Sequence, residues 1–553
     1  MIYPSFAKSE ISEFIRFDCS EINVSGYEAE YAESLLDNIK SKNCKGDKLY
    51  ITIHKESTRR TTYIEKANRY SDEKYFMEIS ADSDMSIQLT VSGKKSLYRA
   101  VQRIKHMLAD GEFPIGTVED YPLFEVRGYI EGFYGTPWEH GKRLEMLQLM
   151  SSYGMNTYYY APKDDPYHRS RWSELYPENE IGNLMELVGF CNANFIDFAY
   201  CIAPGQSMKY SNEEDFEKLC CKVKQLYDIG VRTFGLLVDD IPENLYYEED
   251  KAAFDGEAVN AHIVLSNSLN AFLASLSPDC CLTVCPLQYH GKGNEYYISK
   301  LGRGIDGDIS LFWTGRNICS QEITVSEAVI FADSTNRKPL YWDNFPVNDA
   351  EMYNEMHLGY ISGRDPELYR YSKGIISNTM QYAMSSKIPL LTVCDYLWNP
   401  VAYEGFESWK KAIEIVFGAE AQLIMPFADN LLTSCLKVEN SPMLNAALAK
   451  AEQSFFAGDI GGAMGAVVGY MSALDECCEY LRTVDNPVVS ELKPWVEKQF
   501  IALDLIKAAA SLLLDNSDES RAAVAALLER YLNHPKVLCD FSLQAFAERM
   551  LSL

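Results

Sequence analysis

The stretch Gly235-Leu-Leu-Val-Asp-Asp-Ile-Pro242 determines how the rest of the chain is interpreted. It begins as an apolar run, which is what a fully buried parallel strand requires. It ends at two adjacent carboxylates, Asp239 and Asp240, followed shortly by a proline that cannot extend a strand ladder. Two carboxylates side by side in a cleft cannot both ionise freely, so one can keep a proton and act as an acid beside its anionic neighbour. The stretch therefore predicts either a catalytic pair at a strand end or a structural ion pair or helix cap.

The composition predicts a well-buried globular protein, because 47% of its 553 residues are hydrophobic and 12% are aromatic. Single hydrophobic cores stop growing at about 250 to 300 residues, so we expect about three domains. The chain has 51 basic and 79 acidic side chains and a net charge of −28. No Lys/Arg-rich block interrupts this charge, which argues against nucleic acid or an anionic membrane as a partner. No apolar run is long enough to cross a bilayer.

The cysteines and histidines predict neither a disulfide framework nor a metal site. The 15 cysteines are odd in number and contain no Cys-x-x-Cys, which favours free thiols in a reducing compartment. The eight histidines are scattered without ligand spacing, so we expect no metal and no cofactor. Residues 1–17 show no basic segment followed by an apolar core. We therefore expect a cytoplasmic protein, or one whose leader was removed.

The chain divides into three parts by pattern. Residues 1–117 alternate strand and helix patterns without a catalytic constellation, which favours a supporting α/β domain, and polar Asp110 to Pro114 reads as a linker. Residues 118–417 repeat a strand and helix unit, as expected for a (β/α)8 barrel. Residues 418–553 have helical spacing of Ala, Leu and Glu throughout, which predicts a helical bundle packed on the barrel or a dimer interface.

The middle part contains eight apolar strand candidates. They are Arg127 to Phe133, Asn156 to Ala161, Ile196 to Ala203, Thr233 to Asp239, Cys281 to Pro286, Ile309 to Thr314, Pro339 to Asn344 and Gly374 to Met380. In such a barrel the carboxyl ends of the strands form the active site. Polar and aromatic residues cluster near those ends: Glu131, Lys163, Asp164, Asp165, Asp239, Asp240, Tyr289, Trp313, Trp342, Asn344, Asp349 and Asn378. Each alone has a structural explanation, but together they predict a carbohydrate-shaped pocket.

Four separated motifs resemble glycoside hydrolase family 84, the retaining β-N-acetylglucosaminidases that include bacterial and animal O-GlcNAcases. They are Arg127-Gly-Tyr-Ile-Glu-Gly-Phe-Tyr-Gly-Thr-Pro-Trp138, Tyr158-Tyr-Tyr-Ala-Pro-Lys-Asp-Asp-Pro-Tyr-His168, Val238-Asp-Asp240 and Trp342-Asp-Asn-Phe-Pro-Val-Asn-Asp349. The resemblance covers the barrel best. Thr379 and Met384 depart from the family's pattern, from which we expect altered loop packing or leaving-group preference and intact chemistry.

The resemblance implies a role for nine residues. Asp239 would orient and polarise the 2-acetamido group of the sugar, and Asp240 would be the general acid/base. Tyr289 would hydrogen-bond the acetamido oxygen, and Trp342 would form the wall of the acetamido pocket. The groups implied to hold the sugar hydroxyls are Gly128, Lys163, Asn344, Asp349 and Asn378.

Substrate-assisted hydrolysis explains why two neighbouring aspartates are enough. The acetamido carbonyl attacks C1 and forms an oxazoline, so no protein nucleophile is needed on the opposite face. We therefore expect an exo-acting enzyme that removes terminal β-linked GlcNAc with retention. The substrate would be a glycan or glycoprotein.

Three alternatives stay open on the sequence. One is a hyaluronidase-type or other N-acetylhexosaminidase of the same family, and another is a carbohydrate-binding protein on a retired barrel. The third is a conventional retaining glycosidase with a carboxylate nucleophile such as Asp349. The sequence also leaves the oligomeric state open, a dimer included.

Overall fold

The centre of the molecule is a closed barrel of eight strands. The computed structural model describes residues 3–37, 47–56, 71–82, 84–539 and 541–552. The strand order around the barrel is β10-β11-β12-β13-β14-β7-β8-β9, and β9 pairs with β10 to close the ring. All the neighbouring pairs are parallel. The strands are β7 (Val126–Glu131), β8 (Thr157–Tyr160), β9 (Asp197–Ile202), β10 (Thr233–Leu237), β11 (Cys281–Cys285), β12 (Ser310–Trp313), β13 (Leu340–Asp343) and β14 (Gly374–Asn378). The predicted (β/α)8 barrel and all eight strand candidates are confirmed.

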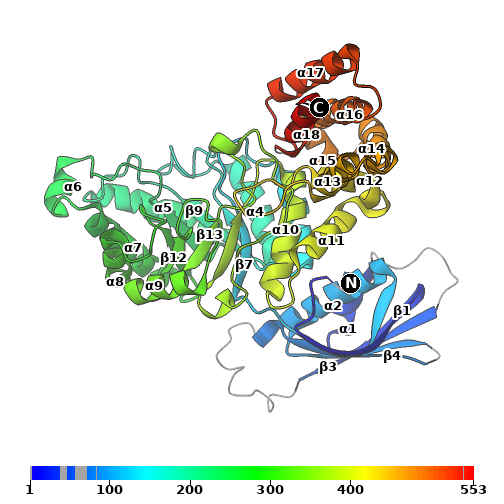
Figure 1. The fold of residues 1–553 in the computed structure, drawn as a ribbon. Helices are drawn as coiled ribbons and strands as arrows, with labels where there is room; N and C mark the ends of the chain where they lie inside the picture. Colours follow the sequence, from blue (N-terminus) through cyan, green and yellow to red (C-terminus); the bar gives the residue numbers. More distant parts are fainter. Residues whose placement is uncertain (1–2, 38–46, 57–70, 83, 540, 553) are drawn as a thin grey trace.

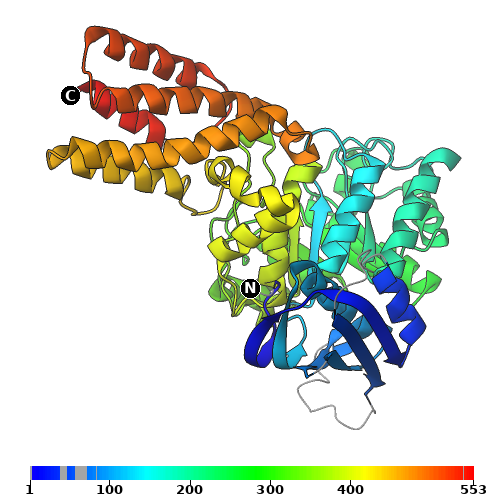
Figure 2. The same cartoon turned by 90° about the vertical axis from the view of Figure 1, so that its right-hand side faces the viewer.

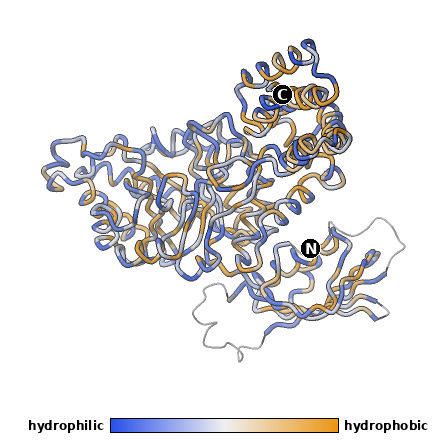
Figure 3. Tube along the Cα trace, in the orientation of Figure 1, coloured by the Kyte–Doolittle hydropathy of each residue, from blue (hydrophilic) through white to orange (hydrophobic). Residues whose placement is uncertain are grey.

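Helices alternate with these strands and surround them (Figure 1). They are α3 (His140–Ser152), α4 (Glu178–Ala193), α5 (Glu213–Asp228), α6 (Glu248–Ala253), α7 (Ala258–Leu276), α8 (Tyr296–Gly304), α9 (Val325–Thr335) and α10 (Ala383–Trp398). Alternate strand residues fill the inside of the barrel, as Leu340 and Trp342 do on β13, while Tyr341 packs outward among the helices. Figure 3 shows hydrophobic segments along the strands and hydrophilic ones on the outer loops.

A separate sheet precedes the barrel, with the strand order β1-β6-β4-β5-β3-β2. Its elements are β1 (Lys8–Arg16), β2 (Cys19–Gly26), α1 (Ala29–Leu36), β3 (Asp47–Lys55), η3 (Ser71–Glu73), β4 (Tyr75–Ala81), β5 (Met85–Val91), α2 (Lys94–Asp110) and β6 (Glu112–Asp120). It has its own hydrophobic core, built from alternate residues such as Leu49, Ile51 and Ile53 on β3. Helix α2 lies between this sheet and the barrel, where Arg99 Nη1 donates to the Ser151 carbonyl at 2.8 Å.

The predicted linker at residues 110–114 is wrong. Gly111 adopts φ 64° and ends α2, and the chain then continues directly as β6, which pairs with both β1 and β4. The polar composition of the segment concealed a tight turn followed by a strand whose buried residues include Phe113 and Val118. The sheet therefore extends to Asp120.

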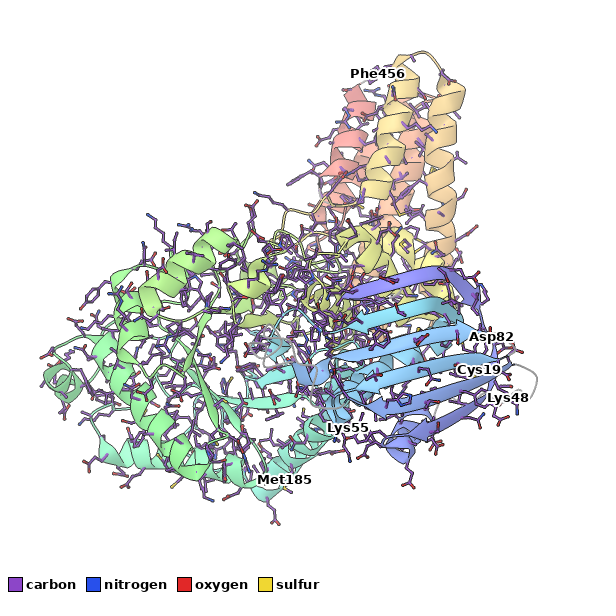
Figure 4. All side chains as sticks on the ribbon, turned by 90° about the horizontal axis from the view of Figure 1, so that it is seen from below. Cys19, Lys48, Lys55, Asp82, Met185 and Phe456 are labelled. Carbon is purple, nitrogen blue, oxygen red and sulfur yellow. The ribbon has the colours of Figure 1, made fainter. Side chains whose placement is uncertain are left out.

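The rest of the chain is helical, as predicted. Its helices are α11 (Gly405–Phe417), α12 (Ala421–Asp429), α13 (Pro442–Phe456), α14 (Ile460–Thr483), α15 (Pro487–Glu491), α16 (Lys493–Ser511), α17 (Asp518–Asn533) and α18 (Ser542–Ser552). The short 3-10 turn η6 (Gly418–Glu420) joins α11 to α12, whereas η4 (Ala350–Met352) and η5 (Leu368–Arg370) lie between the barrel strands β13 and β14. The long helices project from the barrel (Figure 2), and Phe456 lies at their far tip (Figure 4). Within the described ranges, no helix combines the length and apolar character needed to cross a bilayer.

One contact joins this helical region to the barrel near the departure from the family pattern at Met384. Glu491 of α15 accepts hydrogen bonds from the backbone N–H groups of Met384 and Ser385 at 3.2 and 2.9 Å. These N–H groups lie in the first turn of α10, where a carboxylate is favourable. The acidic group at this turn therefore comes from a distant helix.

Candidate active site

A cavity of about 210 Å³ lies at the carboxyl ends of the barrel strands. Eight of the nine site residues predicted from the sequence line it: Lys163, Asp239, Asp240, Tyr289, Trp342, Asn344, Asp349 and Asn378. They come from the ends of β8, β10, β11, β13 and β14 and from the segments that follow these strands. The barrel topology brings them together, as its parallel strands require.

The two aspartates that follow β10 differ in their surroundings. Asp239 is 7% exposed, and its Oδ2 lies 3.4 Å from the ammonium nitrogen of Lys163. Its Oδ1 is buried and accepts no N–H or O–H from the described residues, and the weakly donating thiol of Cys285 lies next to this carboxylate. Asp240 is 32% exposed, and its Oδ2 lies 3.8 Å from the same ammonium nitrogen. A buried carboxylate oxygen without a donor is costly, so Asp239 is ready to accept a hydrogen bond from a ligand.

The Lys163 ammonium is the cation of the site. Burial alone would lower its pKa, but the charges of Asp239, Tyr134 and Asp240 raise the pKa above its usual value. Lys163 also lies over the rings of Tyr134 and Trp342, at 5.3 and 6.0 Å from their centroids. It therefore stays protonated and stabilises the two carboxylates.

Two tyrosine hydroxyls hold Asp240. Tyr134 donates to Oδ2 at 2.8 Å and Tyr289 donates to Oδ1 at 3.2 Å. The backbone of Asp240 is in the left-handed region, with φ 51°, which is uncommon for a residue other than glycine. Such strain persists only where the surroundings impose it, and here it accompanies a carboxylate turned to the cavity.

Asp349 lies at the opposite side of the Tyr134 segment. Its Oδ2 accepts the backbone N–H of Tyr134 at 2.7 Å. Burial raises the pKa of the Asp349 carboxyl above its usual value, partly offset by this hydrogen bond and by Lys163. Tyr134 is thus held by Asp349 through its backbone N–H, and its hydroxyl donates to Asp240.

A linked set of polar groups forms another wall of the cavity. Asn344 Oδ1 accepts from Trp342 Nε1 and from Asn378 Nδ2, both at 2.9 Å, and its Nδ2 donates to the Ile318 carbonyl at 2.9 Å. Asn378 is 4% exposed, and its Oδ1 is buried with no donor in the described part of the chain. The wall is therefore rigid, and one acceptor on it is left for a ligand.

Gly128 is the one predicted site residue that does not line the cavity. It lies within β7, where a Cβ would come 2.3 Å from the Thr157 carbonyl oxygen and 2.8 Å from Ile376 Cδ1. Its small size serves the contact between neighbouring barrel strands. The cavity is instead lined by Gly132, at which a Cβ would lie 2.6 Å from Trp342 Cζ2.

Several other polar residues near the strand ends are structural. Glu131 is fully buried and accepts from Arg143 Nε and Nη2 at 2.8 and 2.6 Å. Asp165 accepts from the hydroxyls of Tyr160 and Tyr176 at 2.8 and 2.6 Å. Trp313 packs on Phe331 in the core. Protein partners satisfy the carboxylates of Glu131 and Asp165, and none of the three residues lines the cavity.

Sequence reasoning missed several residues that line the cavity, among them Tyr134 and Cys319. Tyr134 belongs to the first motif and follows β7 by three residues, so its place after a strand end was a usable signal. Cys319 lies six residues beyond β12, in a segment whose path the pattern does not reveal.

A second, larger cavity of about 650 Å³ adjoins the first. Asp240 and Tyr289 line both cavities and form their common wall. The second cavity is further lined by Glu243, Glu257 and Tyr296, whose side chain is 66% exposed. The pair of cavities can therefore hold one sugar ring on one side of Asp240 and its attached group on the other.

Known proteins are similar to this chain in sequence and in fold. Residues 127–429, more than half of the chain, match the family described as beta-N-acetylglucosaminidase. The Protein O-GlcNAcase of Rattus norvegicus and that of Mus musculus are each 31% identical over 320 residues, which is 57% of this chain and 33% of each relative. The chain therefore spans about a third of the length of these curated relatives.

Solved structures are similar over more of their length. A mutant of the Thermobaculum terrenum O-GlcNAc hydrolase is 31% identical with a TM-score of 0.72, covering 78% of this chain and 95% of that one. The structure named CpGH84B is 26% identical with a TM-score of 0.84, covering 100% of both chains. The chain belongs to the beta-N-acetylglucosaminidase family, glycoside hydrolase family 84.

Proposed function

We propose that this protein is a retaining exo-β-N-acetylglucosaminidase that removes terminal β-linked GlcNAc by substrate-assisted catalysis. The observation that supports it most is Asp239, whose buried Oδ1 has no partner among the described residues. The N–H of a 2-acetamido group is the donor that this oxygen lacks. As positive charge develops on the oxazolinium nitrogen, the anionic carboxylate stabilises the transition state more than the ground state.

Asp240 acts as the general acid and then the general base. It gives its proton to the departing oxygen and later takes one from the water that opens the oxazoline. Tyr134 and Tyr289 hold the carboxylate in place at 2.8 and 3.2 Å. Proton transfer of this kind typically supplies roughly 10²- to 10⁴-fold in rate.

The wall made by Trp342, Asn344 and Asn378 binds the sugar ring. Asn378 Oδ1, buried without a donor in the described chain, accepts a sugar hydroxyl, and Lys163 and Asp349 contribute the other polar contacts. The indole of Trp342 faces the acetamido methyl group. A small cavity with few polar groups of fixed orientation is typical of a monosaccharide site.

The leaving group occupies the second cavity, because the acid Asp240 must stand between the two. Glu243 gives this cavity negative charge, since the carboxylate of Glu257 is paired with Lys300 Nζ at 2.7 Å, and Tyr296 supplies an exposed aromatic face. Both features favour a neutral or basic leaving group, such as a peptide or neutral glycan, over the uronate of hyaluronan.

The proposal is tested by hydrolysis of 4-nitrophenyl N-acetyl-β-glucosaminide, followed by proton NMR. We expect release of nitrophenol with the β-anomer of GlcNAc as the first sugar product. Binding without cleavage would instead support a carbohydrate-binding protein, and the α-anomer would exclude retention. Parallel assays on O-GlcNAc-modified peptide, chitobiose and hyaluronan fragments test the leaving group, for which we expect hyaluronan to be the poorest substrate.

A further inference from the structure

Two cysteines from distant parts of the chain meet behind the wall of the sugar cavity. Cys319 follows β12 and lines the cavity. Cys435 lies between α12 and α13 in the helical region. The two thiols lie near enough to interact with each other, and both are partly accessible to solvent. Their contact therefore joins a loop of the barrel mouth to the helical region.

The pair surrounds Asn344, a residue of the cavity wall. Cys435 Sγ lies 3.5 Å from the Asn344 carbonyl oxygen. The Asn344 side chain donates to the carbonyl of Ile318, the residue before Cys319, at 2.9 Å. Any change in the two sulfur atoms is thus transmitted to Asn344 from its backbone and from its side chain.

The two thiols also differ in acidity. The hydrogen bond from Cys435 lowers the pKa of the Cys319 thiol, and the same contact followed by burial raises the pKa of Cys435. Cys435 therefore keeps the proton when the pair loses one, and Cys319 becomes the thiolate. A thiolate at a cavity wall beside a second thiol is the arrangement of an attacking and a resolving cysteine.

The other cysteines in the described ranges lack this combination. Cys285 also lines the cavity, but it is 3% exposed, and burial together with the Asp239 charge raises its thiol pKa well above the usual value. Cys191, Cys201 and Cys394 are buried in the core with raised pKa values for the same first cause.

We propose that Cys319 and Cys435 are a modification site that peroxide converts to a disulfide, and that this disulfide weakens sugar binding through Asn344. The consequence for the sugar rests on the proposed function, whereas formation of the disulfide does not. Because the two thiols already interact, disulfide formation requires the two sulfur atoms to come from this contact to the bonding distance of about 2.0 Å.

The chemistry balances with hydrogen peroxide as the oxidant. The Cys319 thiolate attacks one peroxide oxygen, so an S–O bond forms, the O–O bond breaks, and hydroxide leaves and takes up a proton as water. Cys435 then attacks the sulfur of this sulfenic acid, so the S–S bond forms and the S–O bond breaks, releasing a second water with the Cys435 proton. Two thiols are oxidised by two electrons and one peroxide is reduced to two waters.

The first test identifies the disulfide without any assay of activity. The full chain is treated with a few equivalents of hydrogen peroxide, remaining thiols are blocked with N-ethylmaleimide, and unreduced peptides are analysed by mass spectrometry. We expect a linked peptide containing Cys319 and Cys435 that dithiothreitol separates. Oxidation of Cys319 to sulfinic acid without the linked peptide would overturn the proposal.

The second test measures how formation of the disulfide affects sugar binding. The KM for 4-nitrophenyl N-acetyl-β-glucosaminide should rise about 5- to 10-fold on oxidation, as expected for the loss of one or two wall hydrogen bonds, and return with dithiothreitol. Each protein is compared with its own reduced form. Cys435→Ser and Cys319→Ser should each abolish the linked peptide and the reversible rise, whereas Cys221→Ser, at an exposed position on α5, should behave as wild type.

The two results separate the two claims. A linked peptide with an unchanged KM would refute control of the sugar site and leave the pair itself established. A wild-type protein without glycosidase activity would refute the proposed function, and the mass spectrum would still decide whether the pair forms.

Discussion

The acidic side chains at the mouth of the barrel, Asp239 and Asp240, differ in their surroundings from Glu73 at the opposite end of the barrel. Glu73 belongs to η3 and is fully buried beside Arg127, near the amino end of β7. It accepts hydrogen bonds from Arg99 Nη2 at 3.0 Å and from Arg127 Nη2 at 2.6 Å. Both of its oxygens are satisfied. At the mouth, Asp239 keeps a buried oxygen that no described residue satisfies, and Asp240 adopts a strained backbone. We therefore assign the fully paired Glu73 to stability, and Asp239, which keeps an oxygen without a donor, to the proposed function.

Asp240→Asn should produce the largest effect on activity and almost none on stability. The amide cannot donate an acidic proton or accept one from water, so kcat/KM on a substrate with a poor leaving group should fall about 10²- to 10⁴-fold. The thermal midpoint should stay close to that of wild type. Asp164→Asn, a change at an exposed aspartate beside Lys163, is the matched control and should keep full activity. Equal turnover by Asp240→Asn would remove Asp240 from the acid role.

Glu73→Gln should give the reverse pattern. It leaves two buried guanidinium groups without their anion, so the free energy of unfolding should fall by about 3 kcal/mol or more, measured by urea denaturation. Activity below the transition should stay near wild type. Glu21→Gln, which removes an exposed partner of Lys48, should leave the unfolding curve nearly unchanged. A Glu73→Gln protein that is stable but inactive would contradict the assignment of Glu73 to stability and of the acids at the barrel mouth to activity.

The pH dependence of stability should reveal Glu73 separately. Burial would raise its pKa, but Arg127 and Arg99 hold the pKa down at about 2. Because the unfolded chain takes up the proton at a higher pH, falling pH favours unfolding. Wild type should therefore lose free energy of unfolding as pH falls from about 5 towards 2, and Glu73→Gln should lose less over the same interval. Parallel losses in the two proteins would exclude Glu73 as the source.

Two glycines of the first motif, five residues of chain from end to end, allow the same distinction between stability and activity to be tested. At Gly132 a Cβ would lie 2.6 Å from Trp342 Cζ2 and 3.1 Å from Asn378 Oδ1, so Gly132→Ala should lower kcat/KM about 10- to 100-fold. Gly128→Ala, which meets the Thr157 backbone at 2.3 Å, should instead lower the thermal midpoint. Gly141→Ala has open space and should change neither. A stable, active Gly132→Ala protein would contradict the described wall.

Tyr134→Phe should have the smallest effect. It removes one of two hydroxyl donors to Asp240 while Tyr289 remains, so kcat/KM should fall about 3- to 10-fold. Tyr296→Phe, which loses a hydroxyl that donates to Glu257 and accepts from Lys300, serves as the control on a nitrophenyl substrate. Unchanged kinetics in Tyr134→Phe would show that Asp240 is held by Tyr289 alone.

Most of the barrel follows from the sequence, because apolar strands that end on polar residues form a strong local pattern. This pattern gave twelve candidate site residues, and the resemblance to the family singled out the eight of them that line the cavity, together with Gly128, which does not. The Gly111 turn was missed because a polar segment can be a linker or a tight turn, and only pairing with β1 and β4 distinguishes them. Gly128 and Gly132 are equivalent in a motif, and only the three-dimensional contacts decide which lines the cavity. The Cys319 and Cys435 contact lies between loops of different domains, for which no periodicity exists.

The central claim is that the sugar's own amide displaces the leaving group while Asp239 supports its nitrogen. The most direct measurement is kcat/KM for aryl β-glucosaminides whose N-acetyl group carries none, one, two or three fluorine atoms. Fluorine withdraws electrons from the attacking carbonyl oxygen, so the rate should fall steadily along the series in wild type. A rate that does not change with fluorination would contradict participation of the amide and require a nucleophile from the protein.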